Sequence, residues 1–286
     1  MPCVSSDWTC SVFDSKHNEE REYDELVDWD RRLTREGPFF RELFDARGVA
    51  SVADVGAGSA RHAIMFRSWG LYVTAIDPSA DMLALARENA EAAGSDLRIV
   101  AGGFGEVAVL LGRKVGALTC TGNALPHVRS LEGLRAALED FSAALESGGV
   151  LVLHYLNHER LVKQRVRTMS PVFRETPGGD KFFLRTLDYT PSGDGVLFDF
   201  VTLVRDPAVR EGAHSIESWP KTLEVDPSGG WSLRSRRSLH FAMPPALIGA
   251  ELARAGFGDV RFLGDHTGRE LDAEKDESMI VTAVRL

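Results

Sequence analysis

Residues 51–60 of the 286-residue chain read SVADVGAGSA, a short apolar run that ends in a glycine-rich turn. Such a run followed by Gly56 and Gly58 predicts a buried strand and a tight turn, and the residues after it have helical spacing. Glycines there let the backbone approach a ligand, and a helix start favours electron-rich groups. A second apolar run ends at Asp77, about 23 residues after Asp54. An acid at that place can bind both ribose hydroxyls, so the two segments together predict a nucleoside site.

Outward from this stretch, strand-like and helix-like segments alternate. The expected strands cover residues 51–55, 71–76, 97–101, 115–120 and 150–155, and the expected helices cover residues 60–69, 78–93 and 131–145. Alternation of this kind is typical of a parallel sheet with helices on both faces. A helical segment over residues 20–46, broken at Gly37-Pro38, comes before it.

The alternation of strands and helices ends after Tyr155. Strand-like segments separated by turn signals follow, over residues 182–189, 196–204, 218–225 and 231–241. A helix over 244–255 and two strands, over 260–263 and 278–284, then return to the first pattern. The prediction is a doubly wound, seven-stranded Rossmann-like α/β sheet with an antiparallel β cap inserted after the fifth strand. Its parts are a flexible tail (1–20), a ligand-binding domain (21–155 and 244–286) and the cap (156–243).

Composition excludes several classes of function. The net charge is −9, whereas a nucleic-acid-binding protein usually shows a basic face. The three cysteines form no pattern with histidine that is typical of a metal site or a disulfide framework. No apolar run is long enough to cross a membrane, and the first residues lack the features of an export signal. We therefore expect a cytoplasmic protein that binds neither nucleic acid, membrane nor metal.

The residues around the turn favour one nucleoside over another. A dinucleotide site prefers a third glycine, but Ala60 and Arg61 stand at that place. Asp54, just before the glycines, would repel a pyrophosphate and suits a cationic amino group. These features favour S-adenosylmethionine over NAD. An NAD-linked oxidoreductase and a regulatory protein that binds S-adenosylmethionine without chemistry remain the alternatives.

At this point the chain resembles a class I S-adenosylmethionine-dependent methyltransferase, in the glycine N-methyltransferase-like subgroup. The segments that carry the resemblance are 51–60 (SVADVGAGSA), 75–83 (AIDPSADML), 120–127 (CTGNALPH) and 151–157 (LVLHYLN). The likeness covers about residues 20–155 and resumes at 244–286. It implies S-adenosylmethionine as the cofactor and S-adenosylhomocysteine as the product.

The resemblance also implies roles for individual residues. Residues of the first motif, with Arg32 upstream, would hold the methionine part of the cofactor, and Asp77 would hold its ribose. Gly103 stands where the family presents an acid or amide to the adenine, which leaves recognition to the backbone at that point. The cofactor set implied is Arg32, Asp54, Gly56, Ala57, Gly58, Asp77, Pro78, Met82, Gly103, Phe104, Thr121 and Gly122.

The acceptor side departs from the subgroup. Enzymes that methylate glycine carry an arginine before the asparagine of the fifth-strand motif, where it clamps a carboxylate. Leu156 stands there, before Asn157, so glycine is not the expected substrate. Arg185 and Arg165 are the alternative candidates for such a clamp. The expected substrate-binding residues are Asn123, Tyr23, Leu156, Asn157 and Arg185.

Methyl transfer from a sulfonium is an in-line displacement, in which the enzyme mainly positions the reactants. A hydroxyl acceptor usually needs a base, and the candidates are His127, His154 and Tyr155. The sequence therefore predicts a methyltransferase that acts on a nitrogen or oxygen of a small molecule. A homodimer is possible, because two-fold dimers are common.

Overall fold

The structure, a computed structural model, describes residues 19–176, 178–205 and 230–286. Its elements are, in chain order, α1 (Glu19–Leu26), α2 (Trp29–Ala46), β1 (Ser51–Val55), α3 (Arg61–Ser68), β2 (Tyr72–Asp77), α4 (Ala80–Ala92), β3 (Arg98–Ala101), α5 (Val107–Leu111), β4 (Val115–Cys120), the 3-10 helix η1 (Leu125–Val128), α6 (Leu131–Ala144), β5 (Leu145–Leu156), α7 (His158–Gln164), β6 (Val172–Thr176), β7 (Gly179–Tyr189), β8 (Gly195–Arg205), β9 (Trp231–Phe241), α8 (Pro245–Arg254), β10 (Phe257–Leu263) and β11 (Ser278–Arg285).

A seven-stranded sheet forms the centre of the main domain, in the order β10-β11-β5-β4-β1-β2-β3. The strands β1 to β5 run parallel to one another. Strand β11 runs antiparallel to both of its neighbours, β5 and β10. The order reverses between β1 and β4, and ligands of doubly wound sheets bind at such a point, beyond the carboxyl ends of the strands. The predicted fold class is confirmed.

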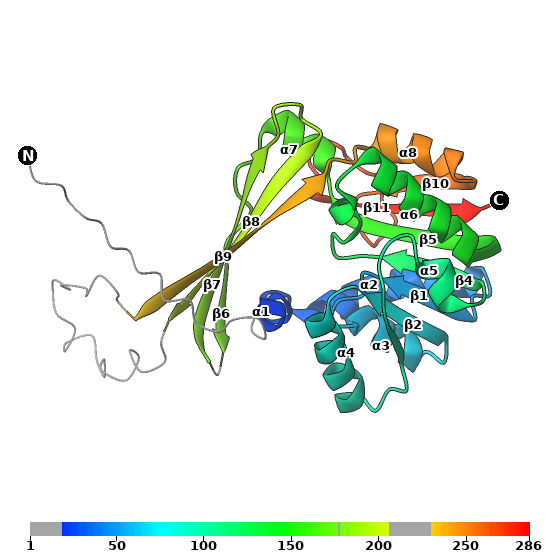
Figure 1. The fold of residues 1–286 in the computed structure, drawn as a ribbon, viewed down its shortest axis with the longest axis horizontal. Helices are drawn as coiled ribbons and strands as arrows, with labels where there is room; N and C mark the ends of the chain where they lie inside the picture. The colour runs from blue at the N-terminus through cyan, green and yellow to red at the C-terminus, as the bar shows by residue number, and fades with distance from the viewer. Residues whose placement is uncertain (1–18, 177, 206–229) are drawn as a thin grey trace, which may run out of the picture.

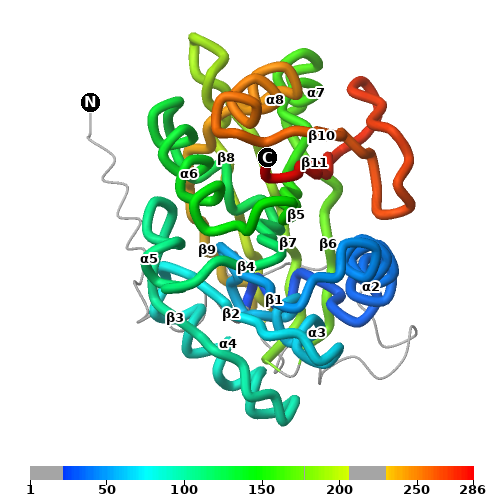
Figure 2. The backbone as a smooth tube through the Cα atoms, turned by 90° about the vertical axis from the view of Figure 1, so that its right-hand side faces the viewer, coloured from blue at the N-terminus to red at the C-terminus, as the bar shows by residue number. Residues whose placement is uncertain are grey.

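Helices cover both faces of this sheet (Figure 2). On one face, α5, α6 and α8 contribute side chains such as Val107, Phe141 and Ile248 to a core against β1, β4, β5 and β11. On the other face, Phe40 of α2 and Phe66 of α3 belong to a second core. Because buried strands alternate their side chains, each strand supplies residues to both cores.

The N-terminal helices differ from the prediction. The expected break at Gly37-Pro38 is wrong, because α2 continues through Pro38 to Ala46. The break lies instead at Asp28, whose side chain caps α2 by accepting a hydrogen bond from the backbone N–H of Arg31 (3.1 Å). Proline removes one helical hydrogen bond, and here it lies on the exposed side of the helix, where water can solvate the freed carbonyl.

The cap is an antiparallel sheet of four strands in the order β6-β7-β8-β9. The sequence missed β6 and α7, and the expected strand over 218–225 lies outside the described residues. In Figure 1 the sheet extends away from the main domain as a long twisted ribbon. The division of the chain at residues 156 and 243 agrees with this layout but stays a prediction.

One face of the cap sheet is turned toward the main domain, and we call it the inner face. The Tyr189 hydroxyl donates to the carbonyl of Leu161 in α7 (2.7 Å), and His240 contacts Asn123, which follows β4. Residues directly opposite each other across strands share a face. The register therefore places these residues on the inner face: Phe183, Arg185, Leu187, Tyr189, Val196, Phe198, Phe200, Thr202, Arg234, Arg236, Ser238 and His240.

Helix α1 lies between the cap sheet and the main domain (Figure 1). On the cap side, the buried carboxylate of Glu22 accepts from Thr202 Oγ1 (2.9 Å) and Arg234 Nη1 (2.6 Å). On the domain side, Asp24 accepts from Arg61 at the start of α3 (2.9 Å). Among the described residues, no helix is both long and apolar enough to cross a membrane.

Candidate active site

The glycine turn after β1 is held against the end of β2. The backbone N–H groups of Gly56 and Ala57 both donate to the carbonyl of Ile76 (2.8 and 3.1 Å). Gly56 has φ +67°, and a Cβ there would lie 2.5 Å from the Cβ of Ala124, so no other residue fits. The turn therefore brings bare backbone to the carboxyl edge of the sheet, as the sequence predicts.

Asp77 lies beside this turn. Its Oδ2 accepts from the N–H of Gly58 (2.8 Å), and its Oδ1 accepts from the N–H of Ser79 (2.9 Å). Burial raises the pKa of Asp77, while these two hydrogen bonds act against that rise. A carboxylate oxygen has room for a second hydrogen bond, so both oxygens can still accept from a diol.

A second acid, Asp54, lies buried at the end of β1. Its Oδ1 accepts from Thr119 Oγ1 (2.7 Å). Burial raises its pKa, and the negative charge of Asp77 adds to the rise. Two acids that share a desolvated region favour a cationic group between or beside them.

Arg32 reaches the same region from α2. Its Nε donates to Glu36 Oε1 (3.0 Å), and Glu36 Oε2 in turn accepts from His62 Nε2 (2.8 Å). The other ring nitrogen of His62 lies 3.5 Å from the Oγ1 of Thr121, at the end of β4. Arg32 Nη2 is buried and has no hydrogen-bond partner in the described part of the chain. This donor is available to an anionic group, and a carboxylate fits it.

Glu36 and His62 were missed by sequence reasoning. They act through Arg32, and nothing in the local pattern marks them. The carboxylate of Glu36 also forms a group with His154 and His266, whose ligand atoms lie within 4.8 Å of one another. A metal ion there is opposed by the guanidinium groups of Arg32 and Arg35, at 3.0 and 3.6 Å from Glu36.

The predicted adenine side lies around β2 and β3. A Cβ on Gly58 would lie 3.8 Å from the Sδ of Met82, which places this methionine, four residues after the exposed Pro78, at the turn. The backbone N–H of Gly103 donates to Glu106 Oε2 (2.9 Å), so a carboxylate lies at the position that lacks the family's acid. Phe104 packs edge-on against Phe141 (6.0 Å between ring centroids) and belongs to the core as well.

The acceptor side is built around Asn123, whose φ of +69° is in the left-handed region. Its Oδ1 accepts from the N–H of Leu156 (3.1 Å), and its Nδ2 donates to Nδ1 of His240 on the cap (3.3 Å). The ring of His127 lies against that of His240, with centroids 4.6 Å apart. Sequence reasoning missed His240, because it lies 117 residues from Asn123 and no local signal links them.

Tyr23 closes the arrangement from α1. A Cβ on Gly122 would lie 3.1 Å from its hydroxyl, so the tyrosine tip packs on the loop after β4. Arg185 lies on the inner face of the cap, where its Nη2 donates to the carbonyl of Ser170 (3.1 Å). Tyr23 thus lies against the loop that carries Asn123, and Arg185 lies on the face of the cap sheet that is turned toward the main domain.

Three predicted site residues have structural surroundings. Tyr155 is 1% exposed, and its hydroxyl donates to the carbonyl of Met243 (3.3 Å) within the core. Asn157 is fully buried; it caps α7 and donates to the carbonyls of Ala273 and Asp276 (both 3.0 Å). The Leu156 side chain packs with the apolar cluster at the base of the cap. The hydroxyl hydrogen of Tyr155 and both amide hydrogens of Asn157 are therefore used within the protein, and the roles expected for these residues stay predictions.

His154 and His127 have different surroundings. His154 Nε2 lies 3.2 Å from Ser278 Oγ, and burial, followed by the charge of Arg32, lowers the pKa of His154 to about 3. His127 has an exposed side chain at the acceptor side. Desolvation by its neighbours and the charges of Arg129 and Arg236 lower the pKa of His127, so its ring is neutral at pH 7. His127 is the better placed of the two to accept a proton.

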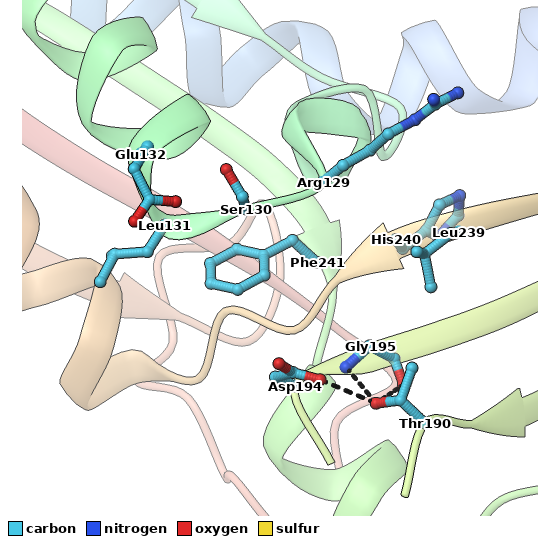
Figure 3. A pocket seen from close by; sticks show the side chains of 10 residues that line it. All are labelled: Arg129, Ser130, Leu131, Glu132, Thr190, Asp194, Gly195, Leu239, His240 and Phe241. Atoms are coloured by element: carbon cyan, nitrogen blue, oxygen red, sulfur yellow. Dashed lines mark hydrogen bonds between the residues drawn. The ribbon is translucent and has the colours of Figure 1, made fainter. Parts of the chain in front are cut away.

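A separate cavity of about 320 Å³ lies where the cap joins the main domain (Figure 3). Its lining includes Arg129, Glu132 and Phe241, with His240 at its edge. The turn that closes it is held by Thr190 Oγ1, which donates to Asp194 Oδ1 (2.8 Å) and accepts from the N–H of Gly195 (2.9 Å). This cavity shares His240 with the acceptor side but none of the predicted cofactor residues.

Comparisons with known proteins agree with this geometry. Residues 52–149 match the family model described as a methyltransferase domain. The chain is 31% identical over 142 residues to a glycine/sarcosine N-methyltransferase of Aphanothece halophytica, covering 50% of this chain and 54% of that protein. It is 32% identical over 140 residues to the protein of the same description from Halorhodospira halochloris, covering 49% and 52%. The chain thus spans about half the length of the curated relatives it matches.

Solved structures extend the likeness to the cap. A structure of DesVI from Streptomyces venezuelae superposes with a TM-score of 0.70 at 20% identity, covering 96% of this chain and 100% of that one. A SAM-bound amino pentose methyltransferase from Micromonospora echinaspora superposes with a TM-score of 0.67 at 22% identity, covering 93% and 96%. At these identities the likeness shows the fold. Residues 52–149 are therefore similar to a methyltransferase domain, and the chain as a whole has the fold of these solved methyltransferases.

Proposed function

We propose that this chain is an S-adenosylmethionine-dependent methyltransferase that acts on a nitrogen or oxygen of a small molecule. One observation carries the proposal: three groups, each complementary to a different part of the cofactor, meet at the carboxyl edge of β1 and β2. Asp77 suits the ribose diol, Asp54 suits the cationic amino group, and Arg32 has a buried N–H without a partner among the described residues, which suits the carboxylate.

The cofactor would supply an electrophilic methyl group, and the chain would position the acceptor against it. Asn123 is fixed by β5 and the cap, so its loop has one orientation. Tyr23 from α1 and the cap sheet enclose the same region and exclude water. Positioning of two reactants in this way is the main contribution that such a displacement needs.

His127 is the residue we propose for proton transfer. A neutral amine acceptor needs no strong base, whereas a hydroxyl does. The pKa of His127 is lowered by desolvation and by two nearby arginines, so the ring is free to accept a proton at neutral pH. We leave Tyr155 and His154 out of this step because the first is a core residue and the second is bonded to Ser278.

The acceptor is proposed to be a molecule other than glycine. Leu156, whose side chain cannot bind a carboxylate, packs in the apolar cluster at the base of the cap. Relatives over half of the chain are glycine/sarcosine N-methyltransferases, so glycine and sarcosine are the competitors to test. The structural neighbours include a sugar N-methyltransferase and an amino pentose methyltransferase, which makes amino sugars a second class to test.

The test is calorimetric titration of the purified chain with S-adenosylhomocysteine, and with NAD for comparison. Asp77→Ala should weaken binding of S-adenosylhomocysteine by about 1–3 kcal/mol, the usual effect of removing a buried hydrogen-bonding group. Asp96→Ala is the matched control, because this acid is exposed and bonded to Arg67 instead. Tighter binding of NAD would favour the oxidoreductase and refute the proposal.

Turnover is then measured with amines, phenols, amino sugars, glycine and sarcosine. Binding of S-adenosylhomocysteine without turnover on any of them would favour a regulatory protein. The homodimer and the cytoplasmic location stay predictions, for which sedimentation and cell fractionation are the measurements.

A further inference from the structure

A row of inner-face residues is not used by the function proposed above. Arg185 on β7 lies directly opposite Phe200 on β8, which lies directly opposite Arg236 on β9. Directly opposite residues point to the same side of a sheet. Contacts on either side of this row show which way it faces. Thr202, in the row next to it, contacts Glu22 of α1, and His240, nearer the base of the cap, contacts Asn123. The row therefore faces the acceptor side, between α1 and the base of the cap.

The two arginines of this row have no carboxylate partner within ion-pair distance among the described residues. The guanidinium of Arg236 lies over the Phe200 ring, 4.8 Å from its centroid. Arg185 Nε is buried and has no hydrogen-bond partner in the same part of the chain. Burial lowers the pKa of Arg185, and Glu277 and Tyr23 act against this without forming an ion pair with it.

The neighbouring arginines of β9 are paired, which sets the row apart. Arg234 donates to Glu22 (2.6 Å), and Arg237 on the opposite face of the sheet donates twice to Asp199 (2.6 and 2.8 Å). Elsewhere in the cap, Arg167 and Arg205 also have a carboxylate partner, Asp188 and Asp180 respectively. An arginine pair left without one on a face turned toward the acceptor side has donors to spare for a ligand.

The spacing suits a single bound group. Adjacent strands lie about 4.8 Å apart, so the backbones of Arg185 and Arg236 are about 10 Å apart. Arg236 leans over Phe200 on the middle strand, toward Arg185, which shortens the gap between the two guanidinium groups. Planar guanidinium groups bind carboxylate and phosphate through paired N–H donors.

We propose that Arg185 and Arg236 bind an anionic group of the methyl acceptor, either a carboxylate or a phosphate. Phe198 and Phe200 form the apolar floor beside it, and the reacting nitrogen or oxygen lies toward Asn123 and His127. This inference rests on the proposed function, since it assigns an acceptor class to that site. It differs from the glycine site of the subgroup, because both cations come from cap strands and neither stands at the position of Leu156.

The experiment measures binding of three small probes to the full chain saturated with S-adenosylhomocysteine. Benzoate carries the carboxylate, phenyl phosphate carries the phosphate, and benzamide is the neutral match. Dissociation constants come from ligand-observed NMR. We expect at least one anion to bind tighter than benzamide, and the tighter of the two identifies the group that the site prefers.

The variants are Arg236→Gln and Arg185→Gln, with Arg237→Gln as the control that removes the same charge from the outer face. Each of the first two should weaken the preferred anion about tenfold or more, the effect of losing a hydrogen bond to a charged group, and leave benzamide unchanged. Arg237→Gln should change neither. If Arg185→Gln fails to fold, Arg236→Gln still decides, because Arg236 is exposed.

Equal binding of the anions and benzamide, or equal effects of Arg236→Gln and Arg237→Gln, would overturn the proposal. The affinity for S-adenosylhomocysteine is expected to stay constant in all three variants. If the unmodified chain did not bind S-adenosylhomocysteine at all, the proposed function would fail. Failure of the proposed function is therefore distinguishable from failure of the anion site alone.

Discussion

Replacement of Glu36 by glutamine is expected to destabilise the protein strongly although the side chain keeps its shape. Glu36 is fully buried and accepts from Arg32 Nε (3.0 Å) and His62 Nε2 (2.8 Å). Glu36→Gln removes the charge and leaves Arg32, whose side chain is 13% exposed, without its counterion. Loss of one partner of a buried ion pair costs about 3–5 kcal/mol.

The size of this effect can be expressed as a melting temperature. The unfolding entropy is about 2.1 cal/mol/K per residue, so for 286 residues a loss of 3–5 kcal/mol lowers the melting temperature by about 5–8 °C. The assay is urea unfolding followed by circular dichroism, with thermal unfolding as a second measurement. Asp96→Asn is the control, because Asp96 has an ion pair with Arg67 on the surface, where little stability is at stake.

The effect should depend on pH in a defined direction. Burial by itself raises the pKa of Glu36, but the hydrogen bond from His62 and the charge of Arg32 outweigh it and hold the pKa well below 4.5. The unfolded chain therefore takes up a proton first as the pH falls, so the stability that Glu36 contributes is complete above pH 4.5 and is lost below it. The difference in the free energy of unfolding between the wild type and Glu36→Gln should accordingly become smaller below pH 4.5. A variant as stable as the wild type at pH 7, or no more affected than Asp96→Asn, would refute this reasoning.

Three further predictions follow from the same structure. The free energy of unfolding should fall as the pH drops from 7 to 5. Burial lowers the pKa of several histidines to about 3 or 4, so below their usual pKa of 6.5 the unfolded state binds protons that the folded state does not. Urea unfolding at the two pH values measures this fall, and equal stability at both would contradict it. The histidines concerned are His154, His158, His240 and His266. Tyr155→Phe should cost about 1 kcal/mol of stability and leave turnover nearly unchanged, whereas a large loss of turnover in the folded variant would make Tyr155 catalytic after all. His127→Gln should lower turnover by about 10²–10⁴ if the acceptor is a hydroxyl and much less if it is an amine, with binding of S-adenosylhomocysteine as the control for folding.

Much of the main domain is predictable from local sequence. Each strand is a short apolar run bounded by glycine or a polar residue, and the turn at Gly56 has a conformation that few other residues adopt. Pro38 shows where the local rule fails. Proline usually ends a helix, but α2 continues because Phe40 and Phe44 after it pack in a fully buried core. Tertiary packing therefore outweighed the local preference.

The site was predicted less completely, for two physical reasons. The first is alternation along β5: His154 and Tyr155 are neighbours in sequence, so they point to opposite faces of the sheet and cannot serve one site. The structure places one beside His266 and the other beside Met243. The second reason is distance along the chain. His240 and Glu36 reach the site from a cap strand and an N-terminal helix, and only the fold brings them there.

The match to the methyltransferase domain model covers only part of the site, residues 52–149. The glycine turn, Asp77, Asn123 and His127 all lie within residues 52–149, the part that matches the methyltransferase domain model. Tyr23 lies before that part, and the inner-face arginines and His240 lie after it. The domain model stops before the cap, and the solved structures that reach the cap show the fold alone, so the acceptor has to be argued from the residues of α1 and the inner face. Those residues offer aromatic rings and two arginines that have no carboxylate partner in the described part of the chain, which is why an anionic acceptor is inferred from this chain rather than from its relatives.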